Sequence, residues 1–373
     1  MAGIYIHIPF CKQKCTYCDF HFSTTYEAYR SLMIASIVDE LKKRASYLEG
    51  KNIETIYFGG GTPSLLTKDE LLFILNTIKA LFVIEEDVEL TLEANPDDIQ
   101  ESSLKEWKEL GFNRLSIGLQ SFKASDLKWM NRAHTSEEAL NCVQLAQKEG
   151  FRNISIDLIY GLPNLTIKEW KETIQTVIDL NITHVSAYCL TVEAKTALHT
   201  MVKKKEIVPS DEDQQSEQFI TLIETLKKAG IEQYEISNFS KKGFHSKHNS
   251  NYWKGKYYLG VGPSAHSFNG VSRSWNIANN QSYMKFLKLN EEWFETEILT
   301  LDNQFNELLL TGLRTIYGVS IERLSEIQSF TKDFSLQLQN FKSENWIMEE
   351  EGMLKLTEEG KLRADYIASS LFV

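Results

Sequence analysis

The feature that most constrains the fold is a regular alternation of two segment types. Short runs of β-forming residues are separated by longer segments whose apolar residues recur with helical spacing, such as Tyr29–Leu48, Lys68–Leu81 and Glu137–Glu149. The β-like runs are Ile4–Ile8, Ile53–Phe58, Val88–Ala94, Arg114–Gln120, Ile154–Ile159 and Thr183–Leu190. Strand–helix alternation of this kind favours parallel β/α units. Six such units predict an α/β fold, an open or partial (β/α)6 barrel rather than a closed eightfold one.

The predicted strands have one apolar face and one polar or small face. In the first run Ile4, Ile6 and Ile8 share one face, and Tyr5 and His7 share the other. Four of the six runs alternate in this way. A closed eightfold barrel fills its lumen with branched apolar side chains. A polar inner face therefore predicts a wet or ligand-filled cavity, and a half-exposed sheet is the alternative.

Charge and cysteine content narrow the class of protein. The net charge of the 373 residues is −11, which disfavours nucleic acid as the main partner because phosphate backbones repel an acidic chain. No apolar run approaches the roughly 20 residues of a membrane span, and no secretory leader precedes the first strand. Three of the five cysteines lie within eight residues. This is typical of a metal or redox site in a reducing, cytoplasmic compartment.

The alternation becomes irregular after residue 230, which predicts three units: a barrel core over 1–230, an aromatic-rich extension over 231–300 and a C-terminal domain over 301–373. The extension contains the turn-rich stretch His245–Asn276. From Asp302 the pattern predicts three helices, a hairpin over Trp346–Leu356 and a last helix, similar to a winged helix. The acidic run Glu349–Glu351 occupies the expected wing, so a packing or lid role is favoured over DNA binding.

The three clustered cysteines, Cys11, Cys15 and Cys18, directly follow the first predicted strand. They therefore lie at its C-terminal end, where barrel active sites are found. Three thiolates on one loop can hold three irons of a [4Fe–4S] cluster and leave the fourth iron open. Cys142 and Cys189 are spaced like apolar core residues. A zinc site with His7 or His21 as fourth ligand is the alternative, but structural zinc sites prefer paired C-x₂-C knuckles.

Further polar and glycine positions fall at the same end of the predicted sheet. The turn Gly59–Pro63 ends the second strand, and glycines there would let a ligand approach the backbone. Glu93 precedes Asn95-Pro96, Gln120 closes the fourth strand, and Asp157 is on the inner face of the fifth. Each alone is usual for a turn, a helix cap or a surface group. Their convergence on one rim predicts a binding site.

Together these residues resemble the radical SAM superfamily, whose hallmark is a C-x₃-C-x₂-C loop and whose GGGTP-like motif binds the amino group of S-adenosylmethionine (SAM). The stretches Ile4–Cys11, Tyr57–Ser64 and Gly118–Phe122 resemble the oxygen-independent coproporphyrinogen III oxidase group. The resemblance implies that Cys11, Cys15 and Cys18 hold the cluster and that SAM completes its coordination. It also implies SAM contacts from Tyr5, Tyr17, Gly60, Gly61, Thr62, Glu93, Gln120, Arg132 and Asp157, with Arg132 as a charge partner for a carboxylate.

Two departures from the oxidases make the chain more similar to the HemW-type haem chaperones. Phe20 stands where the oxidases have a fourth cysteine, and Tyr5 lies almost at the start, without their long N-terminal extension. The chaperones also carry an H-N-x-x-Y-W motif, present here from His248 to Trp253. The resemblance implies that His248 ligates haem and that Tyr252 and Trp253 line the macrocycle. A surface loop with an aromatic anchor is the alternative.

The function expected from the resemblance is that of a haem chaperone. It would bind haem beside a SAM-ligated [4Fe–4S] cluster and pass the haem to an acceptor protein, membrane-associated acceptors included. The first alternative is an enzyme that decarboxylates coproporphyrinogen III with a 5′-deoxyadenosyl radical, which Phe20 disfavours. The second is a radical SAM enzyme acting on RNA, which the acidic charge disfavours.

Overall fold

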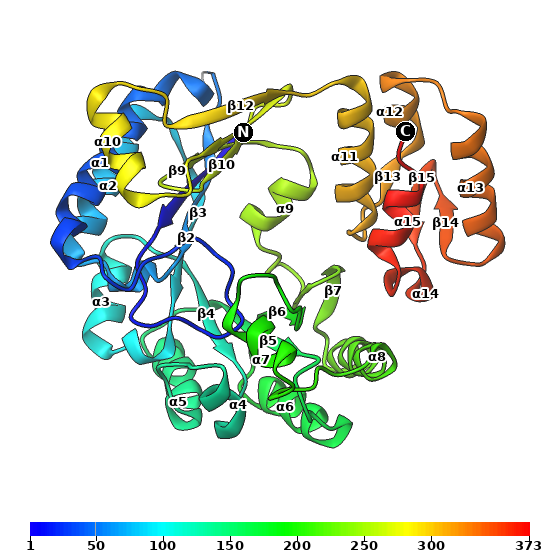
Figure 1. The fold of residues 1–373 in the computed structure, drawn as a ribbon, viewed down its shortest axis with the longest axis horizontal. Helices are drawn as coiled ribbons and strands as arrows, with labels where there is room; N and C mark the ends of the chain where they lie inside the picture. Colours follow the sequence, from blue (N-terminus) through cyan, green and yellow to red (C-terminus); the bar gives the residue numbers. More distant parts are fainter. Residues whose placement is uncertain (49) are drawn as a thin grey trace.

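The computed structural model describes residues 1–48 and 50–373, and its centre is a 12-stranded sheet (Figure 1). The strand order is β12-β11-β10-β9-β1-β2-β3-β4-β5-β6-β8-β7. The six predicted strands pair in parallel and in chain order at its centre. They are β1 Ala2–Ile8, β2 Ile53–Gly60, β3 Ile84–Ala94, β4 Arg114–Gln120, β5 Asn153–Tyr160 and β6 His184–Cys189. The order is that of an open sheet, which confirms the predicted α/β fold with an incomplete barrel.

Helices cover the apolar face of these strands (Figure 1). They are α1 Arg30–Lys43, α2 Lys68–Leu81, α3 Glu101–Glu109, α4 Ala124–Trp129, α5 Ser136–Lys148, α6 Ile167–Asp179 and α8 Glu212–Lys228. The short helix α7 Ala197–Lys203 is instead bonded to the cysteine loop, where the Leu198 N–H donates to the Thr16 carbonyl at 2.8 Å. Helices α2, α5 and α6 each begin with a capping box at Thr67, Thr135 or Thr166. The threonine side chain accepts a hydrogen bond from the backbone N–H of the glutamate three residues on, and the side chain of that glutamate accepts one from the backbone N–H of the threonine. The isoleucines of β1 are fully buried in the same core cluster as the apolar face of α1.

The opposite face of the strands lines a polar interior. His7 is 6 % exposed and Arg114 only 1 % exposed. Thr55, Thr91, Ser155 and His184 are likewise buried. A half-exposed sheet would leave such side chains in water, so that alternative is wrong. The polar inner face is an enclosed lumen, as the alternation predicted.

The chain after residue 230 extends the same sheet at both edges. At one edge β8 Asn238–Ser240 pairs with β6, and β7 Glu232–Glu235 pairs with β8. At the other, β9 Tyr257–Val261 runs parallel to β1, followed by β10 His266–Phe268, β11 Ser272–Asn276 and β12 Phe294–Ile298. Helices α9 Lys247–Trp253 and α10 Asn280–Leu289 complete this region. The boundaries at residues 230 and 300 stay a prediction.

The extension is fastened to α1 by Glu40, which is fully buried. Its carboxylate accepts hydrogen bonds from the backbone N–H of Gly262 at 2.8 Å and from the hydroxyl of Tyr283 at 2.6 Å. Asn276 and Trp293 donate to it as well. A buried carboxylate is tolerated only when its lone pairs are satisfied in this way, so these contacts fix the extension against the barrel.

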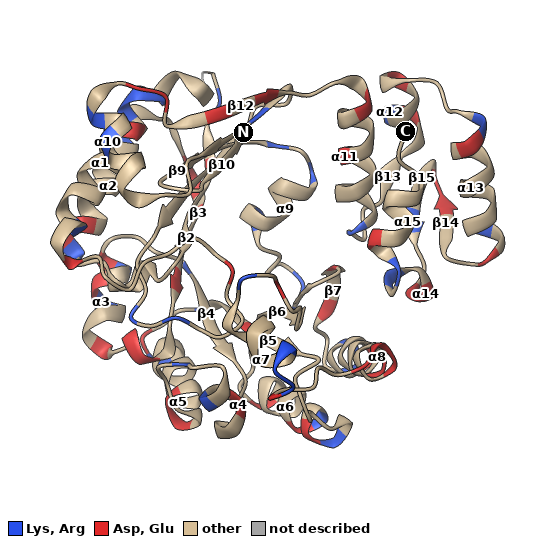
Figure 2. Ribbon diagram, viewed as in Figure 1, with Lys and Arg blue, Asp and Glu red and all other residues tan. Residues whose placement is uncertain are grey.

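The C-terminal unit has its own core, built around Phe305, Leu309 and Ile367. It contains α11 Leu301–Leu313, α12 Ile321–Ile327, α13 Lys332–Ser343, α14 Glu358–Lys361 and α15 Ala364–Ser370. A three-stranded sheet in the order β13-β15-β14 combines Val319–Ser320, Met353–Leu356 and Ile347–Glu350. This confirms the winged-helix-like arrangement. Acidic and basic side chains are interspersed over its helices and over the outer helices of the barrel (Figure 2). No helix in residues 1–48 and 50–373 is both long and apolar enough to span a membrane.

Candidate functional site

A cavity of about 370 Å³ opens at the C-terminal ends of the central parallel strands. It brings together most of the residues predicted from the sequence. Its lining includes Cys11, Cys15, Tyr17, Cys18, Gly60, Gly61, Thr62, Glu93, Gln120, Arg132 and Asp157. The ends of the first five strands and the loops that follow them supply these positions, because parallel strands end at the same edge of a sheet.

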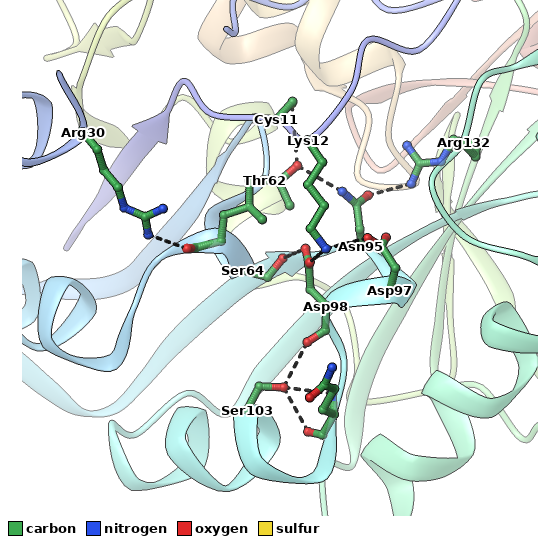
Figure 3. Close-up of polar contacts among 12 residues, drawn as sticks. Cys11, Lys12, Arg30, Thr62, Ser64, Asn95, Asp97, Asp98, Ser103 and Arg132 are labelled. Carbon is green, nitrogen blue, oxygen red and sulfur yellow. Dashed lines mark hydrogen bonds and ion pairs between the residues drawn. The ribbon is translucent and has the colours of Figure 1, made fainter. Parts of the chain in front are cut away.

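The cysteine loop is bonded to the loops that follow the second, third and fourth strands (Figure 3). The Thr62 hydroxyl donates to Cys11 Sγ at 3.6 Å and accepts from Asn95 Nδ2 at 3.0 Å. The Arg132 guanidinium donates to Asn95 Oδ1 at 2.6 Å and to Cys15 Sγ at 3.3 Å. Two of the three sulfurs thus receive hydrogen bonds from side chains on the loops that follow the second and fourth strands.

The three thiols suit a cluster better than a zinc ion. All three are free of disulfides and face the cavity. Burial raises the pKa of Cys11 to about 12 and that of Cys18 to about 11, so iron must displace their protons on binding. Within residues 1–48 and 50–373 no group of three or more His, Cys, Asp or Glu side chains is arranged to hold a single metal ion. In a cluster, by contrast, each thiolate binds a different iron.

The two histidines considered as zinc ligands are already engaged. The Nδ1 of His7 is hydrogen-bonded with the Tyr5 hydroxyl at 3.2 Å, and its Nε2 with the backbone carbonyl of His21 at 2.9 Å. The Nε2 of His21 lies 2.7 Å from Asn280 Oδ1. These ring nitrogens are therefore not free to bind a zinc ion, which argues against the zinc alternative.

The glycine turn after the second strand packs closely against the first strand and the start of the cysteine loop. Gly60 has a φ of +103°, which favours glycine, and a Cβ there would overlap the His7 ring. Its N–H donates to Glu93 Oε2 at 3.1 Å. The neighbouring Gly61 packs against the backbone of Phe10, so a side chain would not fit there either. The turn is held rigidly beside the cysteine loop.

Two carboxylates face the cavity in a desolvated setting. Burial raises the pKa of Glu93 to about 7, with a further increase from the charge of Asp157. Burial likewise raises the pKa of Asp157 to about 6. Such perturbed carboxylates, converging in one cavity, are typical of a binding or catalytic site. Glu93 additionally accepts a hydrogen bond of 2.7 Å from the Tyr57 hydroxyl.

Gln120 lies at a β-bulge at the end of the fourth strand. Its φ is +68°, and the register with the fifth strand shifts between Gly118 and Gln120. Bulges of this kind re-aim side chains near functional sites. Arg132 reaches the same rim, where its Nη2 donates to the carbonyl of Gly118 at 2.8 Å. Its Nε is buried without a partner, which leaves a donor for an acceptor in the cavity.

Four of the predicted ligand-contacting residues lie outside the cavity lining. Tyr5 lies below the cavity, bonded to His7. His248 is 2 % exposed, and its two ring nitrogens lie 2.8 Å from the hydroxyls of Thr55 and Tyr252. Tyr252 and Trp253 are half-buried. Ligation of haem iron through one ring nitrogen of His248 would require the hydrogen bond at that nitrogen to break.

Part of the cavity lining consists of residues that the sequence analysis did not assign to the site. It includes Phe20, Phe22, Ile159, Tyr188, Cys189, Leu190, Thr191 and Glu193. Cys189, expected in the core, is half-buried and also lines the cavity. The position of Tyr188 to Leu190 at the end of the sixth predicted strand was the available signal, since every other strand contributes to the site at that end.

Comparison with known proteins agrees with this geometry. A family model described as the radical SAM superfamily matches residues 5–177. The haem chaperone HemW of Bacillus subtilis is 34 % identical over 97 % of both chains. HemW of Escherichia coli is 36 % identical over 71 % of this chain and 69 % of its own. The mitochondrial radical S-adenosyl methionine domain-containing protein 1 of Bos taurus is 31 % identical over 96 % of this chain and 83 % of its own.

Among solved structures, the coproporphyrinogen III oxidase HemN of Escherichia coli, a radical SAM enzyme, superposes with a TM-score of 0.86. It covers all of this chain and 90 % of its own, at 22 % identity, and therefore shows a shared fold. The sequence relatives extend over nearly the whole chain, well beyond the superfamily core. The chain thus belongs to the radical SAM superfamily and, within it, to the HemW haem chaperone family.

Proposed function

We propose that this chain is a haem chaperone that carries a [4Fe–4S] cluster, binds SAM beside it, binds haem and transfers it to an acceptor protein. The observation that carries the proposal is 34 % identity to a HemW haem chaperone over 97 % of both chains. The cavity supports the cofactor part, because three thiols, a glycine turn and two carboxylates converge there. The proposed location is the cytoplasm.

The residues divide into two proposed roles. Cys11, Cys15 and Cys18 would hold three irons, and Thr62 and Arg132 would donate hydrogen bonds to the sulfurs. SAM would supply the amino and carboxylate groups that complete the fourth iron's coordination. The turn at Gly60, Gly61 and Thr62 would admit its methionine end. Glu93, Gln120, Asp157 and Tyr17 would bind the remainder, and Arg132 would face a carboxylate.

The proposed haem site is assigned from the relatives and from one sequence motif. Support for haem binding comes from the relatives, which are haem chaperones. Assignment of His248, Tyr252 and Trp253 to haem stays a prediction from the shared H-N-x-x-Y-W motif. Because His248 is buried and both of its ring nitrogens are hydrogen-bonded, that assignment requires one of these bonds to break and the ring to become accessible.

The test is anaerobic reconstitution followed by two separate titrations. SAM should perturb the EPR spectrum of the reduced cluster, and haem should give a Soret band on binding. The same preparation, supplied with SAM and a reductant, should leave coproporphyrinogen III unconverted, with HemN as the positive control. Robust conversion of coproporphyrinogen III would overturn the chaperone proposal in favour of the oxidase. Absence of haem binding would rule out the chaperone proposal.

A further inference from the structure

Helix α9, which carries the H-N-x-x-Y-W motif, packs into the barrel at the end opposite the cavity mouth. It contacts β1 and β2 on one side and α11 on the other (Figure 1). The buried carboxylate of Glu89 accepts hydrogen bonds from the N–H groups of Lys247 and His248, both at 2.9 Å. The start of the helix is thereby fixed to β3, and its first turn projects into the lumen.

His248 fills the lumen beneath the cavity together with two tyrosines. Its ring stacks on Tyr57, with centroids 4.9 Å apart and an interplanar angle of 22°. Tyr5 stacks on Tyr57 from farther away, at 6.0 Å. Thr55 and Tyr252 fix the orientation of the imidazole through hydrogen bonds of 2.8 Å. A Cβ at Gly3 would approach Thr55 Oγ1 to 2.7 Å, so the glycine leaves room for this contact.

Tyr57 in turn connects His248 to the floor of the cavity. Its hydroxyl donates to Glu93 Oε1 at 2.7 Å, and Glu93 Oε2 accepts the N–H of Gly60 at 3.1 Å. A Cβ at Gly59 would approach the Tyr57 ring to 2.8 Å, so the ring lies directly against the glycine turn. A continuous series of contacts therefore runs from α9 through one tyrosine to the turn and the carboxylate that face the cavity.

We propose that His248 is a positioning residue for the SAM site: its ring holds Tyr57 in the orientation that fixes Glu93 and the Gly60 turn. This inference rests on the proposed binding of SAM in the cavity. It gives the motif histidine a role that requires no haem. It also explains why the side chain is buried with both nitrogens engaged, an arrangement suited to holding a ring in place.

The experiment is a titration of SAM into anaerobically reconstituted protein, followed by the EPR change of the cluster, with iron content measured in parallel. His248→Ala should weaken SAM binding about tenfold while iron is retained, because an aromatic pair and its hydrogen bonds are lost. His248→Phe keeps the ring and should bind SAM within about threefold of wild type. The milder variant Tyr252→Phe should weaken SAM binding about threefold.

A double-mutant cycle tests the route through Tyr57. Tyr57→Phe removes the hydroxyl that reaches Glu93, so adding His248→Ala to it should cause a smaller loss of SAM affinity than His248→Ala causes in wild type. Additive losses would overturn the inference. Two control variants should bind SAM as wild type does: His245→Ala, whose ring stacks on Tyr234 instead, and Leu309→Ala, which destabilises the separate core of the C-terminal unit.

The outcomes separate this inference from the proposed function. If wild type with its cluster binds no SAM, the proposed SAM site fails and the inference fails with it. If wild type binds SAM and His248→Ala binds it equally, only the inference is overturned. Loss of haem binding in His248→Ala with unchanged SAM affinity would also overturn it, and would identify the side chain as a haem ligand.

Discussion

At the scale of single residues, the site depends on which side chains the loops can hold at the strand ends. The cysteines, the glycine turn and the inward carboxylates could be predicted because each is chemically distinctive and lies at a strand end. Phe22 could not, because an aromatic residue in a loop sequence does not reveal whether it faces a core or a cavity. The burial of His248 was also hidden, since it depends on Thr55 and Tyr57, far away along the chain.

Removal of one cluster ligand should remove the cluster. Wild type prepared without oxygen should be brown, with about four irons and four sulfides per chain. The variants Cys11→Ala, Cys15→Ala and Cys18→Ala should each lose nearly all of the bound iron and sulfide. Cys142→Ala, a buried thiol on α5, and Cys189→Ala should retain them. Iron and sulfide assays check this, and a colourless, zinc-loaded wild type would contradict it.

Gly60 should tolerate no side chain. Gly60→Ala forces a Cβ into the His7 ring at a φ of +103°, which should cost more than about 1 kcal/mol of stability. The distorted turn should also weaken SAM binding. Gly243→Ala is the matched control, because its φ is +87° but a Cβ there meets no neighbour. Chemical denaturation and SAM titration of both variants check this; equal SAM affinities would contradict the assignment of the turn.

SAM binding should weaken as pH falls, because Glu93 titrates near neutrality. Burial raises its pKa to about 7, so the side chain is an anion above that pH and neutral below it. The anion attracts the positively charged sulfonium of SAM, and the neutral acid does not. We expect affinity to fall between pH 8 and pH 6, and Glu93→Gln to bind weakly with little dependence on pH over this window. A flat profile for wild type would contradict a role for this carboxylate.

At the scale of elements, local patterns predicted the helices and the six central strands, but not the edges of the sheet. Helix α2 begins and ends where its periodicity and its capping threonine indicate. The parallel pairing of β9 with β1 joins segments about 250 residues apart in the sequence and has no local signature. The aromatic composition of this segment predicted an irregular extension, whereas tertiary packing makes it part of the sheet.

Helix α9 should depend on Glu89 for its attachment. The carboxylate accepts two backbone N–H groups at the start of the helix, and such charge-assisted hydrogen bonds contribute about 1.5–3 kcal/mol each. Glu89→Ala should therefore destabilise the protein by about 2 kcal/mol or more. Glu86→Ala, at an exposed position of the same strand, should change stability by less than about 0.5 kcal/mol. Denaturation by urea measures both, and equal effects would contradict the attachment.

At the scale of the whole molecule, the C-terminal unit is joined to the barrel through Arg314, at the end of α11. Its Nε donates to Glu235 Oε1 of β7 at 3.0 Å, and its Nη1 to Asp365 Oδ1 of α15 at 2.9 Å. Its guanidinium also lies 5.3 Å from the ring centroid of Trp253. One side chain therefore contacts the barrel, the motif helix and the C-terminal unit. The sequence predicted each of these parts but gave no indication of how they join.

Arg314→Ala should loosen the C-terminal unit while leaving the barrel folded. Glu235 is 2 % exposed, so the substitution leaves a buried carboxylate without its cation, at a cost of about 3 kcal/mol. Asp365 is mostly exposed, so Asp365→Ala removes a pair worth less than about 1 kcal/mol and serves as the control. Hydrogen exchange should accelerate in α11, α13 and α15 of the arginine variant, with the central strands unchanged. Uniform acceleration across both units would instead indicate that barrel and C-terminal unit unfold together, and that Arg314 stabilises one cooperative structure.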